Sequence, residues 1–162
     1  MKRLLLMRHA KSSWDDPTLA DFDRPLNPRG LRAAPAMGAF MRREEILPER
    51  IISSPAMRAR ETTRLVSEGG AFEAEITLED RVYEASANGL RQIAAEVDDA
   101  YSCVMLVGHN PGMEHFVRYL TGQMESMRTT ALAVIDLDIK KWEELSEGTG
   151  SLRALHDPKN IK

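Results

Sequence analysis

The sequence predicts an α/β protein with a largely parallel central sheet. Short apolar segments typical of strands alternate along the chain with segments that begin with helix-start signals. The clearest strand signal is the continuous apolar run Cys103–Val107, which is typical of a strand covered on both faces. With 162 residues, of which 43% are hydrophobic, the chain is long enough to bury a core without disulfides.

The first predicted element is the short apolar run Leu4–Met7. Its length favours a buried strand, although periodicity alone does not exclude a helix. The polar stretch Lys11–Pro28 follows, with three prolines and four aspartates. Such a composition is typical of a loop, so we expect little regular structure before residue 27.

A helix is expected after this loop. Asn27 resembles an N-cap, and Pro28 stands where proline is favoured, at the first helical position. The segment Leu31–Arg43 is rich in Ala and Met and is expected to be helical. Pro35 lies inside this segment and should kink the helix or delay its start.

A second strand and helix are expected next. Arg50–Ser53 has the length and composition of a strand. Ser54-Pro55 is a helix-start signal, and the helix is expected to run to about Ser67, with Gly69 and Gly70 as its stop.

Two further helices and three further strands complete the pattern. Either Ser86 or Asn88 can cap a helix from about Gly89 to Val97, and another helix should end near Leu120. The remaining predicted strands are Glu75–Leu78, Ala131–Leu137 and Ser151–Leu155. The last two could extend the sheet or form a dimer edge. No repeat or linker divides the chain, so we expect a single domain over residues 1–162.

Composition excludes several classes of protein. The single cysteine, Cys103, excludes an intramolecular disulfide and a cysteine-based zinc site. The balance of 22 basic and 25 acidic residues indicates no nucleic-acid partner. No apolar run approaches the roughly 20 residues of a membrane span, and the start lacks a signal peptide's pattern. A cytoplasmic protein is expected.

Residues able to handle a phosphoryl group follow four of the predicted strands. Arg8 and His9 come directly after the first strand, Arg58 shortly after the second, Glu84 after the third and His109 after the fourth. Ligands of α/β sheets bind beyond the carboxyl ends of the strands, so these side chains should share one edge. An imidazole can carry a phosphoryl group covalently, and guanidinium groups match phosphate oxygens. No motif indicates a bound metal or cofactor.

Each of these residues also has an ordinary structural interpretation. Arg8 could be a surface charge after a buried strand, and His9 a histidine satisfied within a turn. Arg58 and Glu84 could be solvated surface residues. His109 is the stronger signal, because it stands among turn-forming residues directly after a buried strand.

Taken together, these segments resemble the histidine phosphatase superfamily, which includes the phosphoglycerate mutases. Leu6–Ala10 resembles its Arg-His signature, Ser53–Thr62 its second motif and Val107–His109 its third. Asp23–Gly30 resembles a segment typical of the short SixA-type phosphohistidine phosphatases. The similarity spans about residues 4–120, and Ala replaces the superfamily's usual Gly at position 10, as is common in this branch.

The resemblance implies a three-layer α/β/α fold of the phosphoglycerate mutase type and a metal-independent phosphatase without cofactor. By similarity, His9 is the nucleophile that becomes phosphohistidine, and a protonated His109 donates to the phosphoryl oxygens. The residues implied to bind phosphate are Arg8, Arg24, Arg58 and His109.

The resemblance leaves the role of Glu84 and the substrate open. Glu84 could protonate the leaving group, position water or be a bystander, since an imidazole leaves more readily than an alkoxide. The chain has little room for a lid, which favours a phosphorylated protein of a phosphotransfer or phosphorelay system. The alternatives are a small-molecule phosphomonoesterase of the same superfamily and a non-catalytic phosphoprotein-binding module.

Overall fold

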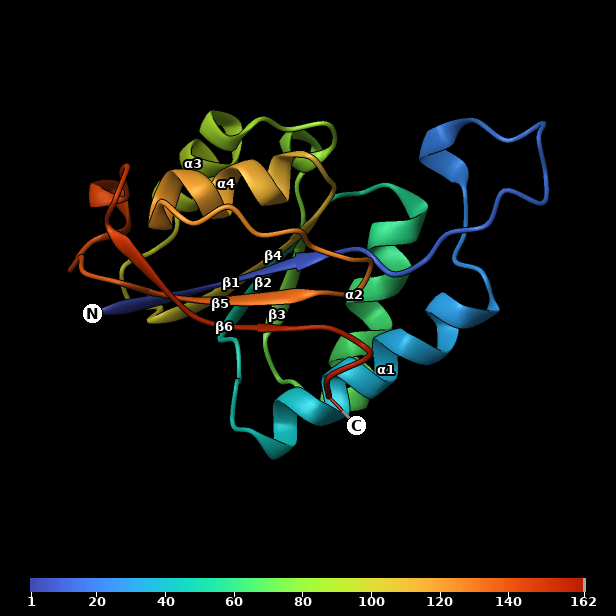
Figure 1. Ribbon diagram of the computed structural model, residues 1–162, viewed down its shortest axis with the longest axis horizontal. Helices are drawn as coiled ribbons and strands as arrows, with labels where there is room; N and C mark the ends of the chain where they lie inside the picture. The colour runs from blue at the N-terminus through green and yellow to red at the C-terminus, as the bar shows by residue number, and fades with distance from the viewer. Residues whose placement is uncertain (162) are drawn as a thin grey trace.

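Six strands form one mixed sheet in the computed structural model, which describes residues 1–161 (Figure 1). The strand order is β3-β2-β4-β1-β5-β6. The first four strands in this order pair in parallel, whereas β5 is antiparallel to both β1 and β6. The bounds are β1 Lys2–Arg8, β2 Arg50–Ser53, β3 Glu75–Leu78, β4 Cys103–Gly108, β5 Leu132–Leu137 and β6 Gly150–His156.

This topology confirms the α/β class and the mostly parallel sheet. The C-terminal strands β5 and β6 extend the sheet, with β6 at its edge, and the dimer-edge role stays a prediction. Lys162, the last residue of the expected domain, lies outside the described residues.

Helices cover both faces of the sheet and create two hydrophobic cores (Figure 1). Leu5 and Met7 of β1 pack on the face covered by helices α1 and α2, while Leu4 and Leu6 pack on the face of α3 and α4. The helices are α1 Pro28–Arg43, α2 Met57–Gly70, α3 Ala87–Ala95 and α4 Gly112–Thr121, with 3-10 turns η1 Asp21–Asp23, η2 Asp80–Val82 and η3 Trp142–Glu144.

Helix α1 begins at Pro28, so the expected delay by Pro35 is wrong. The side chain of Asn27 caps the helix by accepting a hydrogen bond of 2.9 Å from the Gly30 N–H. An interior proline costs about 3 kcal/mol relative to alanine. Full burial of a methionine contributes about 1.5–3 kcal/mol, and α1 buries both Met37 and Met41. The helix therefore accommodates the proline.

Helix α2 differs from the prediction at both ends. It begins at Met57 rather than at Ser54-Pro55, and it continues past Ser67 to end at Gly70, the second glycine of the predicted stop, with Ala71 as a C-cap at a left-handed φ of 51°. Gly69 stays inside the helix, and its lack of a side chain allows α2 to pack closely against α1. A Cβ atom on Gly69 would lie 2.3 Å from the carbonyl oxygen of Pro35, so only glycine allows α1 and α2 to approach this closely.

Helix α3 begins two residues earlier than expected, at Ala87, and ends at Ala95. Of the two possible caps, Ser86 is the one used, since its Oγ accepts a hydrogen bond of 3.1 Å from the Gly89 N–H. None of the helices within residues 1–161 has the length and apolar character needed to cross a membrane.

Candidate active site

The carboxyl ends of β1 and β4 bring two histidines together. The strands are parallel neighbours, and Arg8 pairs with Gly108 at the end of the ladder. The next residue on each strand is a histidine, so His9 and His109 become neighbours. Their ring centroids lie 5.1 Å apart, with the rings tilted by 54°.

The imidazole of His9 is held in one tautomer. Its Nδ1 lies 2.8 Å from the Ala10 carbonyl oxygen, which can only accept, so Nδ1 carries the proton. Burial lowers the pKa of His9 to about 3, leaving a neutral ring with a lone pair on Nε2. The N–H of Ala10 donates to Thr62 Oγ1 at 2.9 Å, which fixes the loop against α2. Ala10 has a negative φ, so the position does not require glycine.

Arg58 reaches His9 from the first turn of α2. Its Nε lies 3.4 Å from His9 Nε2, and only 7% of the residue is exposed. The two terminal nitrogens donate to Asp21, at 2.7 Å to its carbonyl oxygen and at 3.0 Å to Oδ2. The guanidinium group is therefore fixed between an imidazole and a carboxylate.

His109 contacts a serine that follows β2. Its Nε2 lies 2.7 Å from Ser54 Oγ, while its Nδ1 is buried without a hydrogen-bond partner in residues 1–161. Burial and the charge of Arg58 lower the pKa of His109 to about 4. The ring is thus neutral at pH 7 in the unliganded protein. The protonated form expected from the sequence requires a bound dianion to raise this pKa.

Arg8 lies beside both histidines. Its Nη1 donates to the Met127 carbonyl oxygen at 3.1 Å, and its Nε is buried without a partner within the described chain. Burial lowers the pKa of Arg8, and its charge contributes to the lowered pKa values of His9 and His109. The structure therefore brings Arg8, His9, Arg58 and His109 into one cluster.

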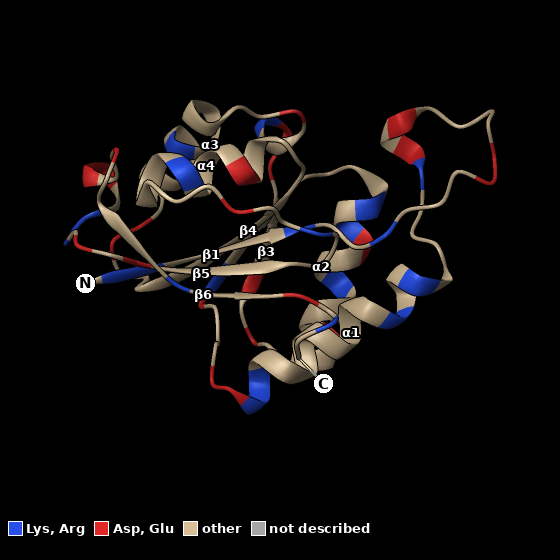
Figure 2. Ribbon diagram, viewed as in Figure 1, with Lys and Arg blue, Asp and Glu red and all other residues tan. Residues whose placement is uncertain are grey.

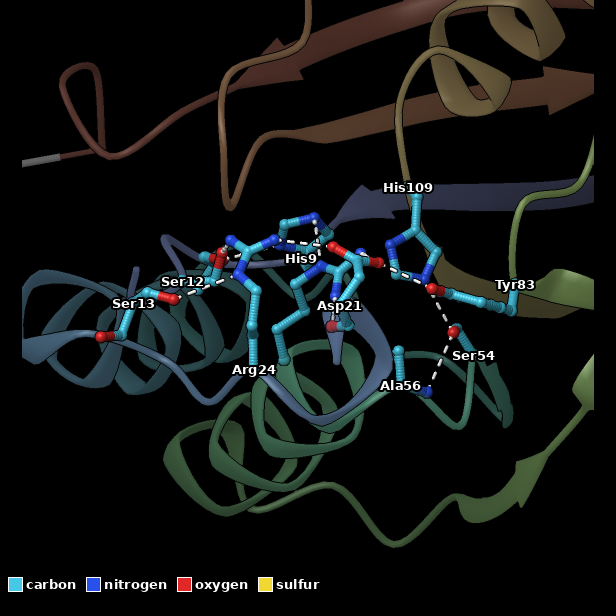
Figure 3. Close-up of polar contacts among 11 residues, drawn as sticks. His9, Ser12, Ser13, Asp21, Arg24, Ser54, Ala56, Tyr83 and His109 are labelled. Atoms are coloured by element: carbon cyan, nitrogen blue, oxygen red, sulfur yellow. Dashed lines mark hydrogen bonds and ion pairs between the residues drawn. The ribbon is translucent and has the colours of Figure 1, made fainter. Parts of the chain in front are cut away.

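Asp21 is a site residue that sequence reasoning missed (Figure 3). Its Oδ2 accepts from the Tyr83 hydroxyl at 2.6 Å, and its Oδ1 accepts from Arg24 at 2.8 Å. The Tyr83 hydrogen bond, followed by those from Arg58 and Arg24, lowers the pKa of Asp21 to about 2. The same bond raises the pKa of Tyr83 to about 12. Nothing in the sequence distinguishes Asp21 from the loop's other aspartates, whereas Ser54 directly follows a strand and could have been found.

Over residues 1–161, Arg24 is linked to the cluster through its ion pair with Asp21. It is 7% exposed, donates to Ser12 Oγ and to the Ser13 carbonyl oxygen, and its guanidinium lies 3.3 Å from the Trp14 ring centroid. Its position is therefore fixed, one ion pair away from Arg58.

Glu84 stands at the same edge of the sheet but forms no hydrogen bond or ion pair within residues 1–161. It is exposed and has a left-handed φ of 59°. Over the same residues, no group of three or more His, Cys, Asp or Glu side chains is arranged to hold a metal ion.

We expect folding stability to fall as the pH drops from about 7.5 to about 5. The unfolded chain protonates its histidines near the ordinary pKa of 6.5, whereas His9 and His109 have folded pKa values of about 3 and about 4. The unfolded state then binds more protons, so the free energy of unfolding decreases below about pH 6.5. Urea unfolding at the two pH values measures this change.

A double variant, His9→Gln with His109→Gln, should lose much of this pH dependence. His115→Gln removes an exposed histidine and is the matched control, which should behave as the wild type. An undiminished pH dependence in the double variant would contradict the assignment to the buried pair.

The chain resembles known proteins in its sequence. The family model described as "Histidine phosphatase superfamily (branch 1)" matches residues 4–102. An uncharacterized chloroplastic protein of Arabidopsis thaliana is 33% identical over 152 residues, which cover 88% of this chain and 70% of that protein.

Solved structures agree with this match. A protein of Agrobacterium tumefaciens assigned as the phosphohistidine phosphatase SixA is 31% identical, with a TM-score of 0.82 over 97% of this chain and 98% of that one. The protein histidine phosphatase SixA complexed with tungstate has a TM-score of 0.85 at 22% identity, with 99% of each chain covered, which shows likeness of fold.

Proposed function

The chain belongs to the histidine phosphatase superfamily, in its SixA-type branch, and on that premise we propose that this phosphatase hydrolyses phosphohistidine on a partner protein through a phosphoryl group carried by His9. Its fold is the phosphoglycerate mutase-like one. The observation that carries the proposal is the neutral His9, whose unprotonated Nε2 accepts a hydrogen bond of 3.4 Å from Arg58 Nε and whose ring lies beside that of His109.

The first step forms a bond between His9 Nε2 and phosphorus. The bond from phosphorus to the substrate imidazole breaks, and the departing nitrogen takes up a proton from solvent, which is returned when the attacking water loses a proton in the second step. The hydrogen bond from His9 Nδ1 to the Ala10 carbonyl oxygen aims Nε2 and stabilises the positive charge that develops on the ring. In the second step water adds its oxygen to phosphorus, the His9–phosphorus bond breaks, and inorganic phosphate leaves.

Charge on the transferring phosphoryl group is stabilised by fixed donors. In this proposal Arg8, Arg58 and His109 each donate to an equatorial oxygen, which is supported by the contact of Arg58 with His9 Nε2, the neighbouring His109 ring and the effect of the Arg8 charge on His9. Asp21 is a positioning residue, because it holds both terminal nitrogens of Arg58 and one of Arg24.

We expect turnover of a phosphorylated protein histidine without added divalent metal. The arginine side chains supply the positive charge that Mg²⁺ supplies in other phosphatases, so excess EDTA should leave the rate unchanged. The value of kcat/KM on a phosphohistidine protein should exceed that on a generic aryl phosphate by about 10-fold or more. Contacts between the enzyme and the rest of the protein substrate, made in both the ground state and the transition state, raise kcat/KM.

Two results would contradict this expectation. Complete loss of turnover in EDTA that Mg²⁺ restores would show a metal-dependent enzyme. A larger kcat/KM on alkyl or aryl phosphates than on the phosphoprotein would favour the alternative, a small-molecule phosphomonoesterase.

Glu84→Gln should separate the two kinds of leaving group. A general acid contributes about 10²–10⁴-fold when the leaving group needs a proton. We propose Glu84 as this acid, so the variant should lose about 10²-fold or more on an alkyl phosphate and less than about 3-fold on phosphohistidine. Steady-state kinetics on both substrates measure the difference.

Glu73→Gln removes another exposed carboxylate and is the matched control. Small and equal losses on both substrates in the Glu84→Gln protein would make Glu84 a bystander.

A further inference from the structure

A groove lined by basic side chains runs from the active site along helix α1, and we call it the basic groove. Its inner part is a pocket of about 370 Å³ whose basic lining residues are Arg8, Lys11, Arg29, Arg128 and Lys159. Its outer part has a volume of about 880 Å³ and is lined by Arg29, Arg32, Arg43 and Lys159. The two parts share Arg29, Ala33, Pro158 and Lys159, so the groove is continuous.

Apart from Arg8, whose charge Glu114 partly offsets, the cations of the basic groove have no acidic partner within the part of the chain that the structure describes. No Asp or Glu among residues 1–161 lines either part. The side chains of Lys11, Arg29, Arg128 and Lys159 are exposed and form no ion pair or hydrogen bond with those residues. Several like charges facing one cavity create a positive potential that attracts anions.

Two buried polar atoms at the inner part also lack partners over the described residues. These are Nε of Arg8 and Oγ1 of Thr130, a residue that is only 1% exposed. Both residues line the pocket, and buried polar groups without a partner are costly unless a ligand or water satisfies them. Both atoms are themselves covered, so the exposed cations supply the anion-binding groups of the inner part.

Backbone contacts hold the basic residues of the inner part in place. The N–H of Thr130 bonds to the carbonyl oxygens of Arg8 and His9, both at 3.1 Å, which fixes the loop that carries Arg128. A Cβ atom on Gly30 would lie 2.2 Å from the Lys11 carbonyl oxygen, so only glycine lets α1 pack against this segment. Lys11 and the first turn of α1 are thereby held together.

We propose that the basic groove binds acidic side chains of the phosphorylated protein on which the active site acts; this rests on the proposed function. A small bisphosphate would fill only the inner part, whereas the lining continues to Arg43, the last residue of α1. Figure 2 shows Lys and Arg positions in blue at both ends of α1. The outer part also presents apolar side chains of Ala36, Ala39 and Ile161 between the basic ones. Apolar and cationic lining together suit a protein segment with carboxylates and apolar residues.

The test compares an outer variant, Arg32→Gln with Arg43→Gln, and an inner variant, Lys11→Gln with Arg128→Gln. The control, Arg118→Gln with Lys140→Gln, removes two exposed cations outside the groove. The substrates are an acidic phosphohistidine peptide, the same peptide with amides replacing its carboxylates, a small bisphosphate and an aryl phosphate. Binding of the unphosphorylated acidic peptide is measured in parallel by fluorescence anisotropy.

We expect both groove variants to raise KM for the acidic peptide about 10-fold or more at low salt, with kcat unchanged. The amide peptide and the aryl phosphate should respond less than about 2-fold, and the control should match the wild type. High salt should remove the difference.

An acidic peptide that binds and reacts equally well with the wild type and the outer variant would overturn the proposal. So would an effect confined to the inner variant and the small bisphosphate, which would assign the groove to a small anion. If the wild type fails on phosphohistidine but hydrolyses the aryl phosphate, the proposed function fails, and peptide binding still tests the groove.

Discussion

His9→Ala should abolish turnover while leaving the fold and phosphate binding in place. His9 makes the covalent bond in the proposed mechanism, which assigns Arg8, Arg58 and His109 to donate to the phosphoryl oxygens. Loss of a nucleophile removes both steps, so kcat should fall by about 10⁴-fold or more. Arg8, Arg58 and His109 still face the anion, so the affinity for inorganic phosphate should fall only modestly.

The measurement is a rapid-quench assay for an acid-labile, base-stable phosphoenzyme. The wild type should form it, and the His9→Ala protein should not. His115→Ala, in which an exposed histidine is removed, is the matched control and should form it normally. Normal phosphoenzyme formation by the His9→Ala protein would show that another residue is the nucleophile.

Arg58→Ala should cause the second largest loss. Removing one fixed donor to the charge that builds up in a transition state costs about 10²–10³-fold in kcat. Arg58 also bridges His9 and Asp21, and a lysine cannot reproduce a three-nitrogen bridge, so Arg58→Lys should recover little of the activity. Steady-state kinetics on an aryl phosphate measure both variants.

A matched control lies on the same helix. Arg60 is exposed two residues further along α2, so Arg60→Ala should retain activity within about 2-fold of the wild type. Loss of the Arg58 charge should also raise the pKa of His109, which NMR titration can follow. Activity of Arg58→Ala equal to that of Arg60→Ala would contradict the role assigned to Arg58.

Two of the differences between the predicted and observed helices, at Pro35 and at Gly69, arise at one helix contact. In the sequence, Pro35 predicts a kinked or delayed helix, and Gly69 with Gly70 predicts the end of a helix. In the structure they meet at the contact between α1 and α2, where a missing Cβ permits close packing. Such local signals reflect only the intrinsic helix propensity of single residues. Packing against an element distant in the sequence can outweigh this propensity by a few kcal/mol.

The sequence by itself determined where the strands lie and which residues stand at their carboxyl ends. Apolar runs mark buried strands, and strand ends in an α/β sheet face the ligand, so Arg8, His9 and His109 could be selected without coordinates.

Only the tertiary structure decided which strands are neighbours and which groups face the histidines. Pairing of β1 with β4 brings residues a hundred positions apart into ring contact, and no local pattern encodes that pairing. Asp21, from a loop without distinguishing signals, lies between Arg24, Arg58 and Tyr83. The pKa values of both histidines likewise depend on burial and surrounding charge, which arise only when separate segments pack together.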